Sequence, residues 1–224
     1  MTEINKPRID ATLATVSFVN AQLAVQKITL VVMIVPMKAS FYSDLLPVGK
    51  PLAVDLTRRY AYAQAALKAA GILSFDDLSV LRTLEQSKTP AFYRTDYHWM
   101  AQASEASAVA AAELIQKQVH FTTLPGGGSK QGEWVNERRY GDLALRFKSS
   151  EQRVILGRDL FRVRASPKEK QSLLDADPAE VHVVGNSFVQ PYLGFPQQLS
   201  NALNRPVSLT WNYGNVGPWA TLLQ

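Results

Sequence analysis

Two short motifs bring together residue types that could perform acyl transfer. The first is an apolar, strand-like run that ends in Gly185-Asn186-Ser187. A serine directly after such a strand lies at the carboxyl edge of a sheet, where open α/β folds bind their ligands. Gly185 permits a sharp turn, and the backbone N–H groups after it could face a developing oxyanion. Taken alone, these residues are more often an ordinary β-turn or a helix N-cap serine. They also lack the second glycine of the Gly-x-Ser-x-Gly motif.

The second motif is Asp96-Tyr97-His98. Residues two apart project to the same side of an extended chain, so Asp96 can orient His98 and stabilise its imidazolium. His98 can then take the proton of a serine hydroxyl. An isolated Asp-x-His beside aromatic residues is more often a surface turn, but the two motifs supply complementary parts of a triad. Their order, Asp96, His98, Ser187, suits a serine hydrolase of the SGNH kind in which the acid–base pair comes first.

The cysteine and histidine content limits the kinds of catalytic and metal-binding site that the chain can form. The 224 residues include no cysteine, which excludes a disulfide scaffold, a cysteine-ligated zinc site and a thiol nucleophile. Of the three histidines, His182 alternates with valines in a strand-like run and His120 closes a helical pattern. No His-x-x-x-His spacing occurs, so we expect no catalytic metal. The segment Gly126-Gly-Gly-Ser-Lys130 lacks the spacing of a phosphate-binding loop and is interpreted as a flexible linker.

The charge pattern points away from nucleic acid as a partner. The net charge is +5, from 24 Lys and Arg against 19 Asp and Glu, and the basic residues are scattered. No run reaches the block of about five or six that marks a nucleic-acid-binding tail. The basic balance fits either a solvated surface or a patch that faces an anionic partner. The longest apolar stretch, residues 28–35, is about half the length of a membrane-spanning helix and lies too far from the N-terminus for a signal peptide. We therefore expect no transmembrane segment, and an export leader or anchor that is absent from this chain.

Hydrophobic periodicity predicts alternating helices and buried strands, which favours a three-layer α/β fold with a mostly parallel sheet. The N-terminal part is predicted as a helix over 8–26, a strand over 28–35, a loop over 36–51, a helix over 55–70, an irregular stretch over 90–99 and an Ala-rich helix over 100–119. The C-terminal part is predicted as an edge strand over 120–124, a loop over 125–132, a charged segment over 133–170 with β-like runs at 154–156 and 161–163, a strand over 180–184, a helix from Pro196 and a strand over 207–211. The charged segment is interpreted as a peripheral insertion.

The sequence resembles the alginate O-acetyltransferase (AlgJ/AlgX-like) family of SGNH-fold proteins. The specific part of the resemblance is Tyr93-Arg-Thr-Asp-Tyr-His-Trp-Met100 followed later by Val184-Gly-Asn-Ser-Phe188. Supporting stretches are Val35-Pro-Met-Lys-Ala-Ser-Phe-Tyr42, Gly141-Asp-Leu143 and Asn212-Tyr-Gly-Asn-Val-Gly-Pro218. They follow the family's order over residues ~30 to 220, so the resemblance covers most of the chain.

The resemblance implies a flavodoxin-like SGNH domain with permuted catalytic motifs and a small β-rich insertion, and it implies roles for individual residues. Asp96, His98 and Ser187 match the triad, with Ser187 forming an acetyl-serine intermediate and no cofactor or metal required. The further candidates for the oxyanion hole or substrate site are Asn186, Tyr192, Gly217, Arg94 and Trp99. Core packing for Trp99 and a surface cation for Arg94 are equally good interpretations.

By the same resemblance we expect a periplasmic enzyme that acetylates hydroxyls of an alginate-like or cellulose-like exopolysaccharide. A membrane-bound O-acyltransferase would deliver the acetyl group. A carbohydrate acetylesterase with the same triad, and a non-catalytic polysaccharide-binding subunit of an acetylation complex, stay open as alternatives. We expect one domain over residues 1–224, with residues 121–175 as the insertion.

Two departures from the family pattern stand out. Met100 replaces the Thr or Ser that would cap the following helix. The chain also ends at Trp219-Ala-Thr-Leu-Leu-Gln224, where the family continues into another strand, so we expect either a truncated C-terminal end or a smaller sheet than usual.

Overall fold

A computed structural model describes residues 5–147, 149–165 and 179–212. The chain divides into two compact units. The first is built from residues up to Ser79 together with Lys117–Val119, and the second from Val80–Gln116 and the residues from His120 onward. Among the described residues, no helix is both long enough and apolar enough to cross a bilayer.

The first unit combines two long helices with a pair of short parallel strands. It comprises α1 (Lys6–Val25), β1 (Val31–Val32), α2 (Lys38–Phe41), the 3-10 helix η1 (Ser43–Leu45), α3 (Val54–Ala69) and β2 (Leu73–Ser74). The Asn5 side chain caps α1 by accepting the Arg8 N–H, and Asp55 at the start of α3 accepts the Asn5 N–H at 2.9 Å. Gly71, in the left-handed region at φ +67°, ends α3 and turns the chain into β2.

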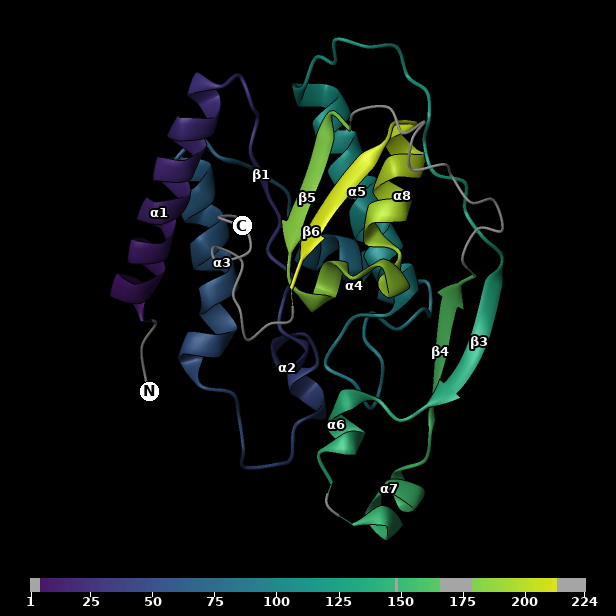
Figure 1. Cartoon of the computed structure of the whole chain (residues 1–224). Coiled ribbons are helices and arrows are strands. Elements are labelled where there is room, and N and C mark those ends of the chain that lie inside the picture. Colours follow the sequence, from purple (N-terminus) through teal and green to yellow (C-terminus); the bar gives the residue numbers. More distant parts are fainter. Residues whose placement is uncertain (1–4, 148, 166–178, 213–224) are drawn as a thin grey trace. The chain divides into compact units, whose positions relative to one another are not determined.

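The second unit carries a parallel strand pair with a helical crossover. Strands β5 (Val181–Gly185) and β6 (Val207–Trp211) are parallel, with Val181 opposite Val207 and Gly185 opposite Trp211. Helix α8 (Phe195–Leu203) connects them and packs against β6 (Figure 1). Between β5 and α8 lie two 3-10 turns, η2 (Ser187–Val189) and η3 (Pro191–Leu193). The carboxyl end of β5 therefore leads directly into Ser187, as the sequence predicts.

Helix α5 (Ala101–Gln118) is the central helix of the second unit, and α4 (Asp77–Gln86) precedes it in the chain. The buried face of α5 consists mainly of alanines and serines, which let neighbouring segments approach closely. Near the N-terminus of α5 lie two aromatic stacks. Trp99 stacks on Phe195 and Tyr93 stacks on Phe161, with ring centroids 6.1 and 3.9 Å apart. Burial of these large rings is the main hydrophobic contribution around the site.

The predicted insertion contains an antiparallel ribbon and two short helices. Strands β3 (Trp134–Arg139) and β4 (Asp159–Arg164) pair from Trp134 opposite Arg164 to Arg139 opposite Asp159. Helices α6 (Asp142–Leu145) and α7 (Ser150–Leu156) lie between them in the chain (Figure 1). A bidentate ion pair from Arg164 to the buried Glu105, at 2.8 and 3.1 Å, fixes β4 to α5. Residues 121–175 as an insertion, and a single domain over 1–224, stay predictions.

The prediction of an α/β fold with parallel strands is confirmed, and three local predictions need correction. Residues 154–156 are not β-like but form the end of α7, since Ser149 and Gly157 delimit a short helix that a three-residue apolar run cannot reveal. In the predicted strand 28–35, only Val31–Val32 pair with a neighbour. The predicted loop 36–51 contains α2 and η1.

The predicted edge strand over 120–124 is wrong, and the reason is a side-chain network. The hydroxyls of Thr122 and Thr123 donate to the Glu180 carboxylate at 2.9 and 2.6 Å. The buried Arg205 donates to the Thr123 carbonyl and to Glu180 at 2.6 Å each. These bonds take the place of a strand ladder.

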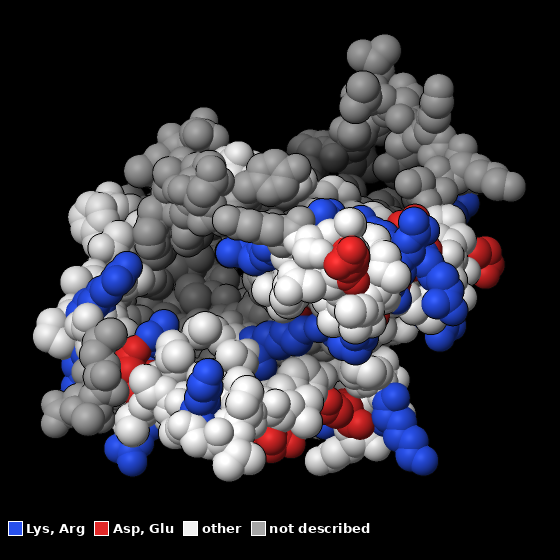
Figure 2. All heavy atoms as spheres, turned by 90° about the horizontal axis from the view of Figure 1, so that it is seen from below, with Lys and Arg blue, Asp and Glu red and all other residues white. Residues whose placement is uncertain are grey.

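Several of the scattered basic residues are packed on aromatic rings. Arg164 lies 3.8 Å from the Trp134 ring centroid, and Arg139 lies 4.1 Å from that of Phe161 and 4.4 Å from that of Tyr192. Figure 2 shows one face of the molecule, on which Lys and Arg side chains are interspersed with acidic and uncharged ones. Part of the basic excess thus stabilises the ribbon through cation–π contacts.

Candidate active site

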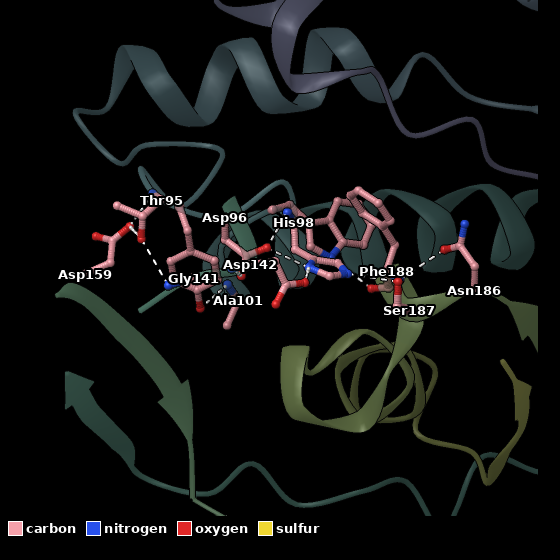
Figure 3. Close-up of polar contacts among 12 residues, drawn as sticks. Thr95, Asp96, His98, Ala101, Gly141, Asp142, Asp159, Asn186, Ser187 and Phe188 are labelled. Carbon is pink, nitrogen blue, oxygen red and sulfur yellow. Dashed lines mark hydrogen bonds and ion pairs between the residues drawn. The ribbon is translucent and has the colours of Figure 1, made fainter. Parts of the chain in front are cut away.

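Asp96, His98 and Ser187 form a continuous hydrogen-bonded chain in the second unit. His98 Nδ1 lies 2.7 Å from Asp96 Oδ1, and His98 Nε2 lies 2.9 Å from Ser187 Oγ (Figure 3). All three side chains are buried. This is the order of contacts that lets a carboxylate orient an imidazole and the imidazole take a hydroxyl proton. Although His98 and Ser187 are 89 positions apart in the chain, they are in contact in space.

A tight loop between α4 and α5 holds His98. An isolated antiparallel bridge joins Phe92 to Trp99, and Met100 N–H donates to the Ala91 carbonyl at 2.8 Å. Trp99 is buried, and its indole N–H donates to the Phe188 carbonyl at 2.9 Å. The same tryptophan therefore connects the loop that carries His98 to the turn that carries Ser187.

The start of α5 explains how the chain tolerates Met100 in place of a capping residue. The Ala101 N–H, one of the N-terminal amides of α5 that lack an acceptor within the helix, donates to the Tyr93 hydroxyl at 3.3 Å. Burial raises the pKa of Tyr93 to about 12, so this phenol stays neutral at physiological pH. A side chain from the preceding segment thus satisfies one of the free amides at this helix start, although not the amide that a Thr or Ser at position 100 would bind.

Residues 141–144 and Asp159 clamp the segment that carries Asp96. Asp142 N–H donates to Asp96 Oδ2 at 3.0 Å, and Gly141 N–H donates to Thr95 Oγ1 at 3.1 Å. Asp159 Oδ2 accepts the Thr95 N–H at 2.7 Å and the Thr95 hydroxyl at 3.2 Å. The orientation of Asp96 therefore depends on residues far along the chain.

The turn after β5 positions Ser187. A side chain at Gly185 would place its Cβ 2.6 Å from Val189 Cγ2, so any larger residue here would displace the buried Val189 side chain. Asn186 caps η2, with its Oδ1 accepting the Phe188 N–H at 3.0 Å. In Figure 3, Asn186 lies on the far side of Ser187 from His98.

Hydrogen bonds hold Asp96 in its ionised form. Burial alone would raise the pKa of Asp96, but bonds from the His98 side chain and from the amides of His98 and Asp142 outweigh it and lower the pKa to about 2. An unpaired aspartate titrates at about 3.9. Asp96 is therefore a carboxylate throughout the neutral range, as an orienting group for His98 must be.

This depressed pKa predicts a pH-dependent contribution to stability. Because the folded-state pKa of Asp96 is the lower one, its contribution is fully present above about pH 4 and is lost as the pH falls toward 2. The size expected from linkage is about 2 kcal/mol. Urea unfolding of the wild type and of Asp96→Asn between pH 7 and pH 2 measures it, since the variant lacks this titration. Parallel pH curves for the two proteins would contradict the prediction.

Gly141→Ala tests the clamp. A Cβ at this position would lie 2.4 Å from the Thr95 carbonyl oxygen and 2.8 Å from Asp96 Cβ. The backbone must shift to relieve this overlap, so we expect a loss of about 2 kcal/mol in unfolding free energy and a displaced Asp96. The matched control is Gly126→Ala, because a Cβ on Gly126 meets nothing within 4 Å. Equal stability of the two variants in urea titrations would show that Gly141 is not under this constraint.

Asp96, His98 and Asp142 also form a group that could be considered for a metal, because their ligand atoms lie within 4.8 Å of one another. Both oxygens of Asp96, however, already accept N–H hydrogen bonds, from His98 and from Asp142. A cation would compete with these donors for the lone pairs of Asp96. The donor pattern favours proton transfer over metal binding at this position.

The structure places the other predicted site residues in different surroundings. Arg94 donates to the Leu156 carbonyl at 2.8 Å, which ties the loop to α7, and Trp99 lies in the core. The Tyr192 hydroxyl donates to Glu137 at 2.8 Å, and its ring lies against Arg139. Gly217 lies outside the described residues. Roles for these residues and for Asn186 in the oxyanion hole or substrate site stay predictions.

Sequence reasoning did not single out two residues that lie beside the triad. The Tyr97 ring lies 4.0 Å from the His98 ring, centroid to centroid, and Asp142 Oδ2 lies 3.8 Å from His98 Nδ1. Tyr97 stands between Asp96 and His98 in the sequence motif, so its position in the chain could have indicated that it lies near His98. For Asp142, the only sequence signal of a role in the site was its place in the stretch Gly141-Asp-Leu143, which resembles the family.

The fold and this site define an SGNH hydrolase-like domain. The family model described as SGNH hydrolase-like domain, acetyltransferase AlgX, matches residues 1–224, and the chain belongs to this family.

Two solved structures share the fold. The O-acetyltransferase domain of Pseudomonas putida AlgJ superposes with a TM-score of 0.79 at 23% identity, over 97% of this chain and 75% of that one. Pseudomonas aeruginosa AlgX superposes with a TM-score of 0.69 at 16% identity, over 90% of this chain and 49% of that one. This chain thus spans about half the length of that AlgX structure. No curated protein sequence matches the chain significantly.

Proposed function

We propose that this chain is an O-acetyltransferase that transfers acetyl groups to hydroxyls of a bacterial exopolysaccharide. The observation that carries the proposal is the continuous chain from Asp96 through His98 to Ser187, with contacts of 2.7 and 2.9 Å. Membership of an acetyltransferase family supports the same reaction.

In the first half-reaction, Ser187 Oγ attacks the carbonyl carbon of the acetyl donor while its proton moves to His98 Nε2. Asp96 stabilises the imidazolium through Nδ1–H. The tetrahedral intermediate collapses, the bond to the donor breaks, and the leaving group takes the proton from His98. The products are acetyl-Ser187 and the deacylated donor.

In the second half-reaction, an acceptor hydroxyl loses its proton to His98 and attacks the acetyl-serine carbonyl. Ser187 Oγ then leaves and recovers its proton, so that one acetyl ester is consumed and one is formed. Phe188 N–H is already donated to Asn186, whereas the Ser187 N–H has no acceptor among the described residues. We assign the Ser187 N–H as one donor to the oxyanion.

The setting of the reaction belongs to the same proposal. We place the enzyme in the periplasm, with a polysaccharide as acceptor and a membrane-bound O-acyltransferase as the source of acetyl groups. The site requires no cofactor in this mechanism, because proton transfer and covalent catalysis supply every step.

Trapping the intermediate tests the function. The protein is mixed with p-nitrophenyl acetate, quenched in acid and digested, and the peptide containing Ser187 is examined by mass spectrometry for an acetyl group. Repeating the reaction with oligomannuronate or a cello-oligosaccharide and analysing the sugar separates the activities: an acetylated sugar indicates a transferase, and acetate alone an acetylesterase. If no acetyl-Ser187 forms but the protein binds the glycan, the chain is a non-catalytic binding subunit.

A further inference from the structure

The residues that border the triad differ sharply from it in exposure. Ser187 and His98 are only 4% and 6% exposed, and Asp96 is 3% exposed. Tyr97 is 37% exposed, and the Asp142 side chain is 47% exposed. Both residues are in contact range of His98, so they lie on the solvent side of the buried triad (Figure 3 shows Asp142 beside His98).

The Tyr97 ring is packed against His98, and Tyr97 is partly exposed. Its ring lies against His98 with centroids 4.0 Å apart and planes 32° apart, and the Phe188 ring lies 6.2 Å away. The imidazole covers one face of the ring, and more than a third of the residue is exposed, so a ligand can reach part of Tyr97. An exposed aromatic ring binds apolar ring faces, such as the C–H face of a pyranose.

The polar groups around Tyr97 converge on the nucleophile. Burial raises the pKa of Tyr97, and its hydroxyl interacts with both Ser187 and Asp142, so the phenol is neutral and can donate or accept a hydrogen bond. The backbone of Asp142 is fixed by its N–H bond to Asp96 Oδ2 at 3.0 Å, while its half-exposed carboxylate has Oδ2 at 3.8 Å from His98 Nδ1. A carboxylate in this position accepts hydrogen bonds from sugar hydroxyls and repels another carboxylate.

From this arrangement we infer that Tyr97 and Asp142 form the subsite for the acceptor sugar. One pyranose unit stacks on the exposed part of the Tyr97 ring, and the hydroxyls along one of its edges bind Asp142. This position directs a neighbouring hydroxyl of the same sugar toward His98 and acetyl-Ser187. A unit that carries a carboxyl group is oriented with that group away from Asp142. The inference rests on the proposed function and assigns its acceptor site to residues other than Trp99, which is buried.

Binding to an inactive protein tests the subsite independently of turnover. In the Ser187→Ala background, calorimetry measures the affinity for oligomannuronate and for a cello-oligosaccharide of the same length. We expect Tyr97→Ala and Asp142→Ala each to weaken binding of the preferred oligosaccharide about tenfold, and Tyr97→Phe to retain most of the affinity because the ring remains. Phe147→Ala is the matched control, since Phe147 is a comparably exposed aromatic at 45% and lies in the same unit.

Steady-state kinetics on the otherwise unaltered chain give a second readout. With p-nitrophenyl acetate as donor, Tyr97→Ala should raise the acceptor KM about tenfold and lower the ratio of transfer to hydrolysis by a similar factor. If the Tyr97 and Asp142 variants keep the wild-type affinity for the oligosaccharide and the wild-type ratio of transfer to hydrolysis, the subsite is overturned. The proposed chemistry at acetyl-Ser187 would stay intact. Failure of the wild type to bind either oligosaccharide would also overturn it. Loss of oligosaccharide binding in Tyr97→Ala without any acetyl-Ser187 in the wild type would keep the subsite and remove the proposed function.

Discussion

Ser187→Ala is expected to abolish both acetyl transfer and hydrolysis of p-nitrophenyl acetate. Ser187 is the only one of the three triad groups that forms a bond to the acetyl carbon in the proposed mechanism, so its removal leaves no route to an acyl-enzyme. Removal of a serine nucleophile from a hydrolase triad lowers kcat by about 10⁶-fold. The substitution removes one hydroxyl that contacts His98 Nε2 at 2.9 Å, and the change in unfolding free energy should stay near 1 kcal/mol.

The matched control for this variant is another buried serine in the same unit. Ser200 Oγ accepts the Ser129 N–H at 2.9 Å and donates to the Arg205 carbonyl at 2.6 Å, so Ser200→Ala removes two structural hydrogen bonds. We expect Ser200→Ala to lose about 1–2 kcal/mol of stability and to keep its activity per folded molecule. Turnover by Ser187→Ala at the wild-type rate, with an equal folded fraction by circular dichroism, would remove Ser187 from the mechanism.

Some parts of such a site can be predicted because the residues that form them are close together in the sequence. Ser187 was predictable because an apolar strand, Gly185 and a serine follow one another within a few residues, and a Cβ on Gly185 would press on Val189. His98 was predictable because its partner Asp96 is two residues away. In both cases the information lies within a few residues, the range over which strand alternation and turn chemistry operate.

The surroundings of the triad were not predictable in this way. Asp142 and Asp159 contact the segment around Asp96 from 46 and 64 residues away, and no periodicity announces such contacts. The two aromatic residues that flank His98 have different environments: Trp99 is buried and stacks on Phe195, whereas Tyr97 is 37% exposed. Trp99 was named from the sequence as a candidate site residue, and Tyr97 was not. Tertiary packing alone decides which of them a ligand can reach.

Asp96→Asn is expected to lower kcat about 10⁴-fold while preserving the fold. Asp96 Oδ1 accepts from His98 Nδ1 at 2.7 Å and from the His98 N–H at 2.9 Å, and Oδ2 accepts the Asp142 N–H at 3.0 Å. A carboxylate accepts on both oxygens, but an asparagine has one oxygen and one NH2 group. If its oxygen faces the Asp142 N–H, its NH2 group faces His98 Nδ1.

That arrangement would force the wrong tautomer on His98. With an NH2 donor opposite Nδ1, the imidazole proton moves to Nε2, where it points at Ser187 Oγ, and His98 can no longer take the serine proton. The imidazole ¹⁵N chemical shifts report this directly, because the proton should lie on Nδ1 in the wild type and on Nε2 in the variant. Asp159→Asn is the matched control: it weakens the bonds that hold Thr95 but does not touch His98, so it should cost stability and leave the tautomer as in the wild type. An Asp96→Asn protein with unchanged ¹⁵N shifts and near-wild-type kcat would show that Asp96 does not set the protonation of His98.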